Sequence, residues 1–292
     1  MVNDMSKITC TNIRKSYKGK NVLHGINLEL ESGKIYGLIG RNGAGKTTLL
    51  SIISAQNPAS GGEVRLDGDK IWENKKVLER ICFSRELPSG VNSLTSSYKI
   101  KEYFKIAGIF YKNWDQTYAD KLAVDFELDV NTRLSKLSKG MLSAVTIIVA
   151  LASKCDYTFL DEPVAGLDVI MRDKFYKLLL EEYMETGRTF VISTHIIDEA
   201  SSVFEDVIII KDGQLLLQEN TEELVSRCVH VSGKESDVDE AVAGLDTYHT
   251  EMVGRSKGVT VMLKEGQSVK SSENVSVQSV SLQNLFIALC GD

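Results

Sequence analysis

The sequence predicts an α/β fold built on a parallel sheet, followed by a small α+β unit at the C-terminal end. A glycine-rich loop stands between an apolar strand pattern and a helix pattern near residues 35–55. Further along, strand and helix patterns alternate, which is typical of parallel sheets with helices on both faces. After about Asn220 the composition shifts toward Ser, Val, Asp and Glu. With 292 residues, the chain is long enough for about two domains.

The first expected elements are strands. β-type runs at residues 7–17, 22–30 and 35–39 are separated by glycine and serine turn signals. The third run leads into the glycine-rich loop, and residues 46–55 then show helical apolar spacing. A strand–loop–helix unit is therefore expected there, and the N-terminus of such a helix can bind phosphate groups.

The middle of the chain is expected to be helical. Residues 94–126 are rich in helix formers and aromatic side chains and contain no convincing strand, and the helical pattern continues through 141–152. We interpret about residues 87–155 as an inserted helical subdomain. Its aromatic side chains are expected to form its core, and some of them, with Leu94, are candidates for a groove that holds a partner helix.

Strand patterns return at residues 157–160, 190–193 and 207–210, with a long helix pattern at 169–185 between the first two. Strands that alternate with helices in this way complete a parallel sheet whose faces are covered. We expect this first domain to comprise residues 1–219.

The remaining residues, 220–292, are expected to form an accessory or regulatory domain. Two alternating runs, at 228–232 and 258–263, have the pattern of strands, and residues 282–289 have the pattern of a closing helix. A small α+β unit is predicted here.

Composition and charge exclude several classes of protein. Hydrophobic residues make up 43% of the chain and charged residues 25%, too apolar a balance for extended disorder. The net charge of −6 argues against nucleic acid as the main ligand. The five cysteines are scattered without a Cys-x-x-Cys pair, so free thiols are expected rather than a zinc or redox centre. The most membrane-like stretch, 140–153, has 14 residues, fewer than the roughly 20 that span a bilayer, and the N-terminus shows no signal-peptide pattern.

Residues 40–47 carry a phosphate-binding pattern. They read Gly-Arg-Asn-Gly-Ala-Gly-Lys-Thr, which fits G-x-x-x-x-G-K-[ST] in the expected context between a strand and a helix. Backbone N–H groups of such a loop surround the α and β phosphates, Lys46 would reach the β and γ phosphates, and Thr47 would ligate Mg²⁺. The alternative is a flexible turn with a solvated lysine. The nucleotide-binding candidates in this segment are Asn42, Gly43, Ala44, Gly45, Lys46, Thr47 and Thr48.

Two carboxylates, Asp161 and Glu162, follow an apolar strand pattern at the sheet edge where ligands of α/β proteins bind. We expect Asp161 to hold Mg²⁺, directly or through water. Glu162 would orient or deprotonate the attacking water, because transfer of a γ-phosphate needs charge neutralisation and an in-line nucleophile. Such a pair can also be a helix N-cap, but the phosphate loop upstream favours the catalytic interpretation.

Further motifs, in the same order along the chain, resemble those of ATP-binding cassette (ABC) ATPases. Residues 137–141, Leu-Ser-Lys-Gly-Met, resemble the family's Leu-Ser-Gly-Gly-Gln signature. Residues 164–168, Val-Ala-Gly-Leu-Asp, are similar to its D-loop, and His195 at the end of a strand pattern is similar to its switch histidine. Tyr17 falls where the family has an aromatic residue that stacks on adenine. The resemblance covers residues 8 to about 218.

The resemblance implies a P-loop NTPase core of the RecA-like type, with an antiparallel β subdomain and the inserted helical subdomain. It implies ATP and Mg²⁺ as cofactors, and a homo- or heterodimer in which Ser138 and Gly140 bind the ATP held by the second nucleotide-binding subunit. Asp168 is a further nucleotide-binding candidate. His195, a catalytic candidate with Glu162, would contact the γ-phosphate and the partner's D-loop.

Three of these residues also have simpler explanations when each is taken alone. Ser138 could be an ordinary helix N-cap, since serine is among the preferred capping residues. His195 could be a structural hydrogen-bonder, and Tyr17 could be an aromatic residue on a strand surface. Their position in the family's order favours the functional interpretation.

Two regions depart from the family pattern. Lys139 and Met141 replace the first glycine and the glutamine of the signature. Residues 81–86 occupy the place of the family's glutamine loop but contain no glutamine, and Glu86 aligns best with it. A glutamate could still ligate Mg²⁺ and contact a membrane partner. The alternative for Glu86 is an exposed loop carboxylate.

The resemblance implies the ATP-hydrolysing subunit of a transporter whose transmembrane permease is a separate chain, located at the cytoplasmic face of the cell membrane. The loop spacing and residues 280–289 resemble exporters of the ABC-2 type, including those for antimicrobial or amphipathic peptides. Two alternatives remain open: a soluble ABC ATPase acting on a cytosolic assembly, and an ATP-dependent clamp with little turnover. No nucleic-acid partner is expected.

Overall fold

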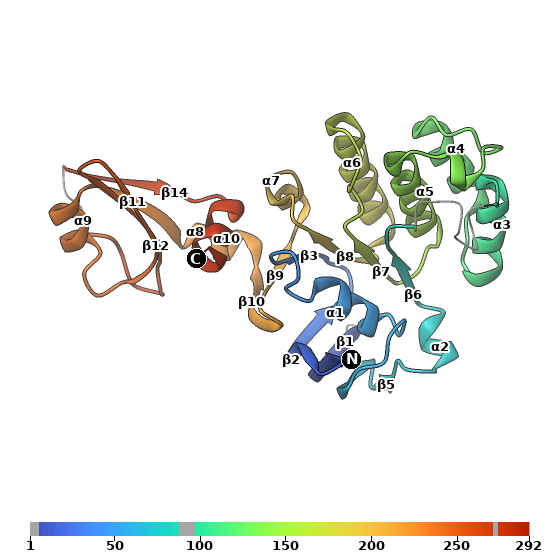
Figure 1. Ribbon diagram of the computed structural model, residues 1–292, viewed down its shortest axis with the longest axis horizontal. Helices are drawn as coiled ribbons and strands as arrows, with labels where there is room; N and C mark the ends of the chain where they lie inside the picture. The colour runs from blue at the N-terminus through green and yellow to red at the C-terminus, as the bar shows by residue number, and fades with distance from the viewer. Residues whose placement is uncertain (1–5, 88–96, 271–273, 292) are drawn as a thin grey trace.

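The computed structural model describes residues 6–87, 97–270 and 274–291 (Figure 1). Within these residues, a six-stranded sheet lies at the centre of the larger, N-terminal part, which ends at Asn220. An antiparallel sheet and the helix that follows the glycine-rich loop cover one face of this central sheet, and longer helices from the middle of the chain cover the other. A third sheet belongs to the C-terminal part and lies at the far end of the molecule (Figure 1). The predicted α/β class is therefore confirmed.

The central sheet has the strand order β10-β9-β3-β8-β7-β6. Its strands are β3 (Ile35–Ile39), β6 (Ile81–Ser84), β7 (Tyr157–Asp161), β8 (Thr189–Thr194), β9 (Asp206–Lys211) and β10 (Gln214–Asn220). All neighbouring strands are parallel except β9 and β10. Every residue of β3, β7 and β8 is buried, as expected for parallel strands covered on both faces.

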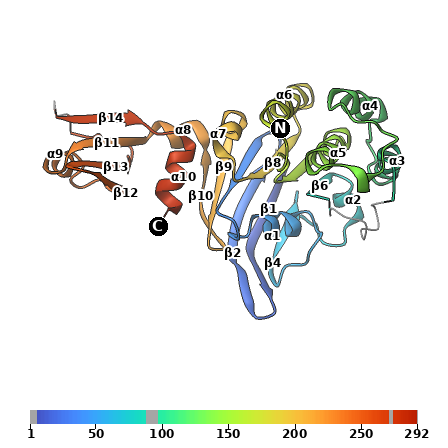
Figure 2. The same cartoon turned by 45° about the horizontal axis from the view of Figure 1, so that its top comes forward.

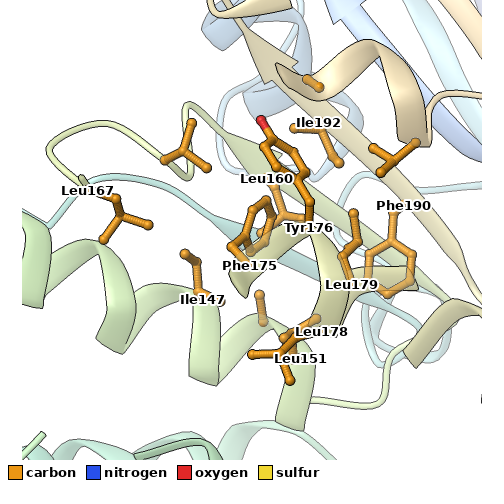
Figure 3. Packing of buried hydrophobic residues seen from close by; sticks show 14 of the residues in the cluster. Ile147, Leu151, Leu160, Leu167, Phe175, Tyr176, Leu178, Leu179, Phe190 and Ile192 are labelled. Carbon is orange, nitrogen blue, oxygen red and sulfur yellow. The ribbon is translucent and has the colours of Figure 1, made fainter. Parts of the chain in front are cut away.

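Alternate residues of these strands face two different hydrophobic cores. In β3, Tyr36 belongs to the core that includes α1 (Lys46–Ile53), whereas Ile35 belongs to the core that includes α5 (Lys139–Ala152) and α6 (Val169–Thr186). In the second core, side chains of α6 pack between α5 and strands β7 and β8 (Figure 3). The continuous apolar strand patterns in the sequence follow from this burial on both sides.

The antiparallel sheet packs against α1 and has the order β2-β1-β4-β5. Its strands are β1 (Lys7–Tyr17), β2 (Lys20–Glu31), β4 (Gly61–Leu66) and β5 (Asp69–Lys70), and α2 (Lys75–Leu78) follows. The first two strands match the predicted runs. The sequence did not predict β4, because only two of its residues are buried and it lacks a continuous apolar pattern.

The helical subdomain contains α3 (Ile100–Phe110), α4 (Gln116–Asp125) and the short η1 (Leu134–Lys136), and it leads into α5. Every residue from Leu142 to Ala152 in α5 is buried, so the most apolar stretch of the sequence is a core helix. Among the described residues, no helix has both the length and the apolar character needed to cross a membrane. Leu94, expected in a partner groove, lies outside the described residues.

The C-terminal part begins with α8 (Thr221–Ser226), whose N-cap is Asn220. Its sheet has the order β12-β13-β11-β14, and all neighbouring strands are antiparallel. The elements are β11 (Cys228–Lys234), α9 (Glu235–Ala241), β12 (Asp246–Val253), β13 (Ser256–Met262), β14 (Val275–Ser279) and α10 (Leu282–Cys290). The helix α9 connects two parallel strands, β11 and β12, that have β13 between them, the split βαβ arrangement.

The last helix, α10, returns to the N-terminal part (Figure 2). Leu282 and Leu285 join the large core, and Lys211 Nζ of β9 donates to the Leu289 carbonyl at 3.1 Å. The α10 helix also lies beside α7 (Ile197–Ala200), the short helix that follows β8. The C-terminal sheet has a small core of its own, so the two parts are joined mainly through α8 and α10.

Candidate functional site

The glycine-rich loop connects the end of β3 to the start of α1. Gly45 is the N-cap of α1 and has a left-handed backbone with φ 107°. A Cβ on Gly45 would lie 2.7 Å from Leu23 Cδ2, and one on Gly40 would lie 2.6 Å from the Ile210 carbonyl oxygen, so neither position accepts a side chain without movement. Gly43 also has positive φ, and a Cβ there would meet nothing within 4 Å. The loop therefore keeps an open backbone surface at a helix N-terminus, which fits a bound phosphate.

The first residue of α1 is Lys46, whose side chain is buried. Its Nζ donates to the Gly40 carbonyl at 2.6 Å and lies 3.7 Å from Glu162 Oε1. The loop folds over the lysine, so its charge is held inside the loop rather than in solvent. This contrasts with the alternative of a solvated lysine.

The two carboxylates lie at the carboxyl end of β7. Asp161 is the last residue of β7 and is paired in register with Ser193 of β8. Ser193 Oγ donates to Asp161 Oδ1 at 2.5 Å and accepts the N–H of Glu162 at 3.1 Å. One buried hydroxyl therefore holds both acidic residues, although no motif in the sequence indicates Ser193. The signal for Ser193 was its place at the end of an apolar strand, two residues before His195.

Glu162 has a left-handed backbone with φ 49°, which a residue other than glycine rarely adopts unless its surroundings hold it. Its Oε2 lies 2.6 Å from Nδ1 of His195, and its Oε1 faces Lys46. The imidazole can donate from Nδ1 when that nitrogen carries the proton. Glu162 thus lies between a cation and a histidine, at the sheet edge that also carries the glycine-rich loop.

The oxygen atoms at this edge suit Mg²⁺. Thr47, the second residue of α1, supplies a hydroxyl, and Asp161 supplies a carboxylate. Among the described residues, no group of three or more His, Cys, Asp or Glu side chains could hold a metal alone. Mg²⁺ usually binds through one or two protein oxygens together with substrate phosphates. The donor set therefore fits a metal that arrives with a nucleotide.

The signature segment begins α5. Ser138 is the N-cap, and its hydroxyl accepts the N–H of Met141 at 3.2 Å, as the simpler interpretation expected. Its hydroxyl proton remains available as a donor. A Cβ on Gly140 would lie 2.6 Å from the Gly166 carbonyl oxygen, so the signature segment packs directly on the D-loop segment.

The D-loop segment ends at Asp168, the N-cap of α6, which accepts the N–H of Met171 at 2.9 Å. Ser138 and Asp168 both line a cavity of about 290 Å³. Behind the D-loop, Arg172 donates to the Leu167 carbonyl at 2.9 Å and pairs with Glu199 of α7 at 3.0 Å. The D-loop is thereby connected to the helix that follows His195.

Tyr17 and Glu86 contact lysines rather than the acidic pair. Tyr17 ends β1 with 43% of its surface exposed, and Lys15 Nζ lies 4.8 Å from the centre of its ring. Tyr17 is therefore a partly exposed aromatic residue at the end of a strand. Glu86 follows β6, and its Oε1 lies 3.2 Å from Lys139 Nζ. Glu86 is therefore engaged with the signature segment rather than being an unpaired loop carboxylate.

Comparisons with known proteins point to one family. Residues 23–165 match the family model described as "ABC transporter". The chain is 31% identical to the tungstate uptake system ATP-binding protein TupC of Peptoclostridium acidaminophilum, over 72% of this chain and 96% of TupC. It is 28% identical to the bacitracin transport ATP-binding protein BcrA of Bacillus licheniformis, over 97% of both chains. Among solved structures, the dimeric ATP-binding cassette MJ0796 bound to ADP and Pi is 26% identical, with a TM-score of 0.63 over 73% of this chain and 98% of the other.

Proposed function

This chain belongs to the ATP-binding proteins of ABC transporters, and from that premise we propose that it hydrolyses Mg·ATP to power export of a substrate through a separate membrane subunit. The observation that carries the proposal is the position of Glu162 between Lys46 and His195, beside a phosphate-type loop. A carboxylate in this position can accept a proton from a water molecule that attacks the γ-phosphate.

The proposed reaction assigns one role to each side chain. The glycine-rich loop holds the phosphates through its N–H groups, and Lys46 leaves the Gly40 carbonyl to contact the β and γ phosphates. Thr47 and Asp161 would hold Mg²⁺, which when bound neutralises charge on the phosphates. Glu162 orients the water and takes its proton. His195 holds the carboxylate of Glu162 in place and contacts the γ-phosphate.

A dimer completes the proposed site. The likeness to a dimeric cassette supports two copies that face each other, with Ser138, Gly140 and Asp168 of one copy against the ATP of the other. Ser138 retains a hydroxyl proton that could be donated to a phosphate, and the N-terminus of α5 favours an anion. Tyr17 would stack on the adenine, because its ring is exposed.

The direction of transport is proposed from the C-terminal part. BcrA matches nearly the whole of this chain. TupC is almost fully covered by its match, but the part of this chain that TupC does not match is close in length to residues 220–292. We therefore propose 1–219 as the ATPase domain and 220–292 as an accessory domain shared with the bacitracin relative, and place this chain with exporters. Its location would be the cytoplasmic face of the membrane, through the permease subunit.

Replacing Glu162 with glutamine tests this function. The amide keeps the shape of the carboxylate but cannot accept the water's proton, so we expect ATP turnover to fall by about 10²-fold or more while ATP still binds. The variant should also accumulate as an ATP-bound dimer, measured by size-exclusion light scattering with and without Mg·ATP. Adding Ser138→Arg should return it to monomer by blocking the contact between subunits. Wild-type turnover in Glu162→Gln would show that another group is the base.

A further inference from the structure

The two charged residues that depart from the family pattern contact each other. Lys139 Nζ lies 3.2 Å from Glu86 Oε1. Glu86 follows β6, whose carboxyl end lies beside that of β7, and Lys139 is the first residue of α5. One ion pair therefore connects the sheet edge that carries the candidate hydrolysis site with the signature segment of the same subunit.

The aliphatic part of the Lys139 side chain packs against the D-loop segment. A Cβ on Gly166 would lie 2.8 Å from Lys139 Cγ, so the aliphatic part of the lysine lies against the Gly166 backbone. Ser143, one turn further along α5, donates to the Ala165 carbonyl at 2.6 Å and fixes the helix against the D-loop. The charged ends are less restricted, since the side chains of Lys139 and Glu86 are 55% and 51% exposed. The aliphatic part of Lys139 is therefore held in place, while its ammonium group can change partners.

We propose that Lys139 exchanges between two anions: Glu86 of its own subunit when the subunits are apart, and the γ-phosphate of the ATP held by the partner when they close. This inference rests on the proposed function, because it requires a site shared between two subunits. Lys139 directly follows Ser138, so closure that brings a phosphate to the serine also brings it near the lysine. An exposed ion pair contributes little stability, so a more highly charged phosphate can displace the carboxylate.

The exchange has a consequence for the second site. While Glu86 is paired, the ammonium group of Lys139 balances its charge. When Lys139 moves to the partner's phosphate, Glu86 is released, and its carboxylate would then be free to help hold the Mg²⁺ of its own subunit. Binding of ATP to one subunit would thereby prepare the metal site of the other.

The experiment measures ATP-dependent dimerisation of the full chain on the Glu162→Gln background, by light scattering at saturating Mg·ATP. Lys139→Ala should weaken the dimer about 10-fold, because a charge-assisted contact with a phosphate is lost. Glu86→Gln should strengthen it several-fold, since no ion pair within the subunit must first be broken. Lys136→Ala removes an exposed lysine three residues away and should leave dimerisation unchanged.

A charge reversal distinguishes the proposed exchange of partners from an ion pair that only stabilises its own subunit. Lys139→Glu combined with Glu86→Lys restores the ion pair but presents a carboxylate to the partner's phosphate, so it should dimerise no better than Lys139→Ala. Full recovery of the dimer would show that the ion pair only stabilises its own subunit, and it would refute the proposed exchange of partners.

The outcomes also distinguish this inference from the function on which it rests. If the parent Glu162→Gln chain stays monomeric with Mg·ATP, the shared site fails and the exchange fails with it. If the parent dimerises and Lys139→Ala dimerises equally well, only the exchange is wrong. Calorimetry of each variant establishes that ATP is saturating in every comparison.

Discussion

Replacing Ser193 with alanine tests whether one buried hydroxyl supports the candidate hydrolysis site. Ser193 Oγ contacts both Asp161 Oδ1, at 2.5 Å, and the N–H of Glu162, at 3.1 Å. The residue is fully buried, so water cannot easily replace the hydroxyl. Glu162 has a strained left-handed backbone, which persists only where neighbouring groups hold it. Loss of the hydroxyl should therefore affect both stability and turnover.

These contacts determine how much stability and turnover Ser193→Ala should lose. The substitution removes a hydrogen bond to a charged group, a contact of about 1.5–3 kcal/mol. The N–H of Glu162 keeps a second acceptor, the Ser193 carbonyl at 3.1 Å, so it is not left unpaired. We expect the free energy of unfolding to fall by about 2 kcal/mol and Tm to fall by about 4–8 °C. We expect kcat to fall about 10-fold, which equals ~1.4 kcal/mol of activation free energy.

Calorimetry measures Tm, and phosphate release at varied ATP concentrations measures kcat and KM. Ser153→Ala is the matched control, because Ser153 is also fully buried but donates to the neutral Ala150 carbonyl at 2.7 Å, at the end of α5. It should lower Tm by a smaller amount and leave kcat unchanged. A Ser193→Ala protein with reduced Tm but wild-type kcat would refute the proposed support of the site, and an unchanged Tm would refute the energetic argument.

Two further substitutions test the fold. Glu182 is completely buried and pairs with Lys154 at 2.7 Å and with Arg188 at 3.0 Å. In a denaturant titration, Glu182→Gln should therefore lower the free energy of unfolding by about 3 kcal/mol. Glu181 is exposed, so Glu181→Gln should have little effect in the same titration. Asp67 is partly desolvated, which raises its pKa, but hydrogen bonds from Arg80 and the Lys7 N–H outweigh this and hold the pKa below its usual range. Its stabilising contribution is present above pH ~4 and disappears as pH falls through the lowered pKa, so Asp67→Asn should flatten the acid side of a stability profile measured by calorimetry.

Patterns within short stretches of the sequence predicted those elements whose structure is set by residues close together in the chain. The central strands are buried on both faces, so β3, β7, β8 and β9 appear as continuous apolar runs. The glycine-rich loop needs residues of particular conformation at fixed spacing, so it is visible in eight consecutive residues. The order of the motifs along the chain also indicates the family.

Weakly patterned elements were missed for a physical reason. In the C-terminal sheet, the edge strands β12 and β14 have almost no buried side chains, so no alternation marks them in the sequence. Only the inner strands β11 and β13 were predicted, because their apolar residues pack against α9. The return of α10 to the large core depends on contacts with residues more than 50 positions away, which periodicity does not encode.

The sequence by itself determined the fold class, the phosphate-type loop and the identity of the acidic pair, because each depends on residue types at short, fixed spacing. The tertiary structure decided which distant groups meet. It brought Ser193 to Asp161 through the pairing of parallel strands, and it brought Lys139 to Glu86 across 53 positions of the chain. A side-chain contact between segments that are separate in sequence is set by how sheets and helices pack, so these partners could not be inferred from either segment alone.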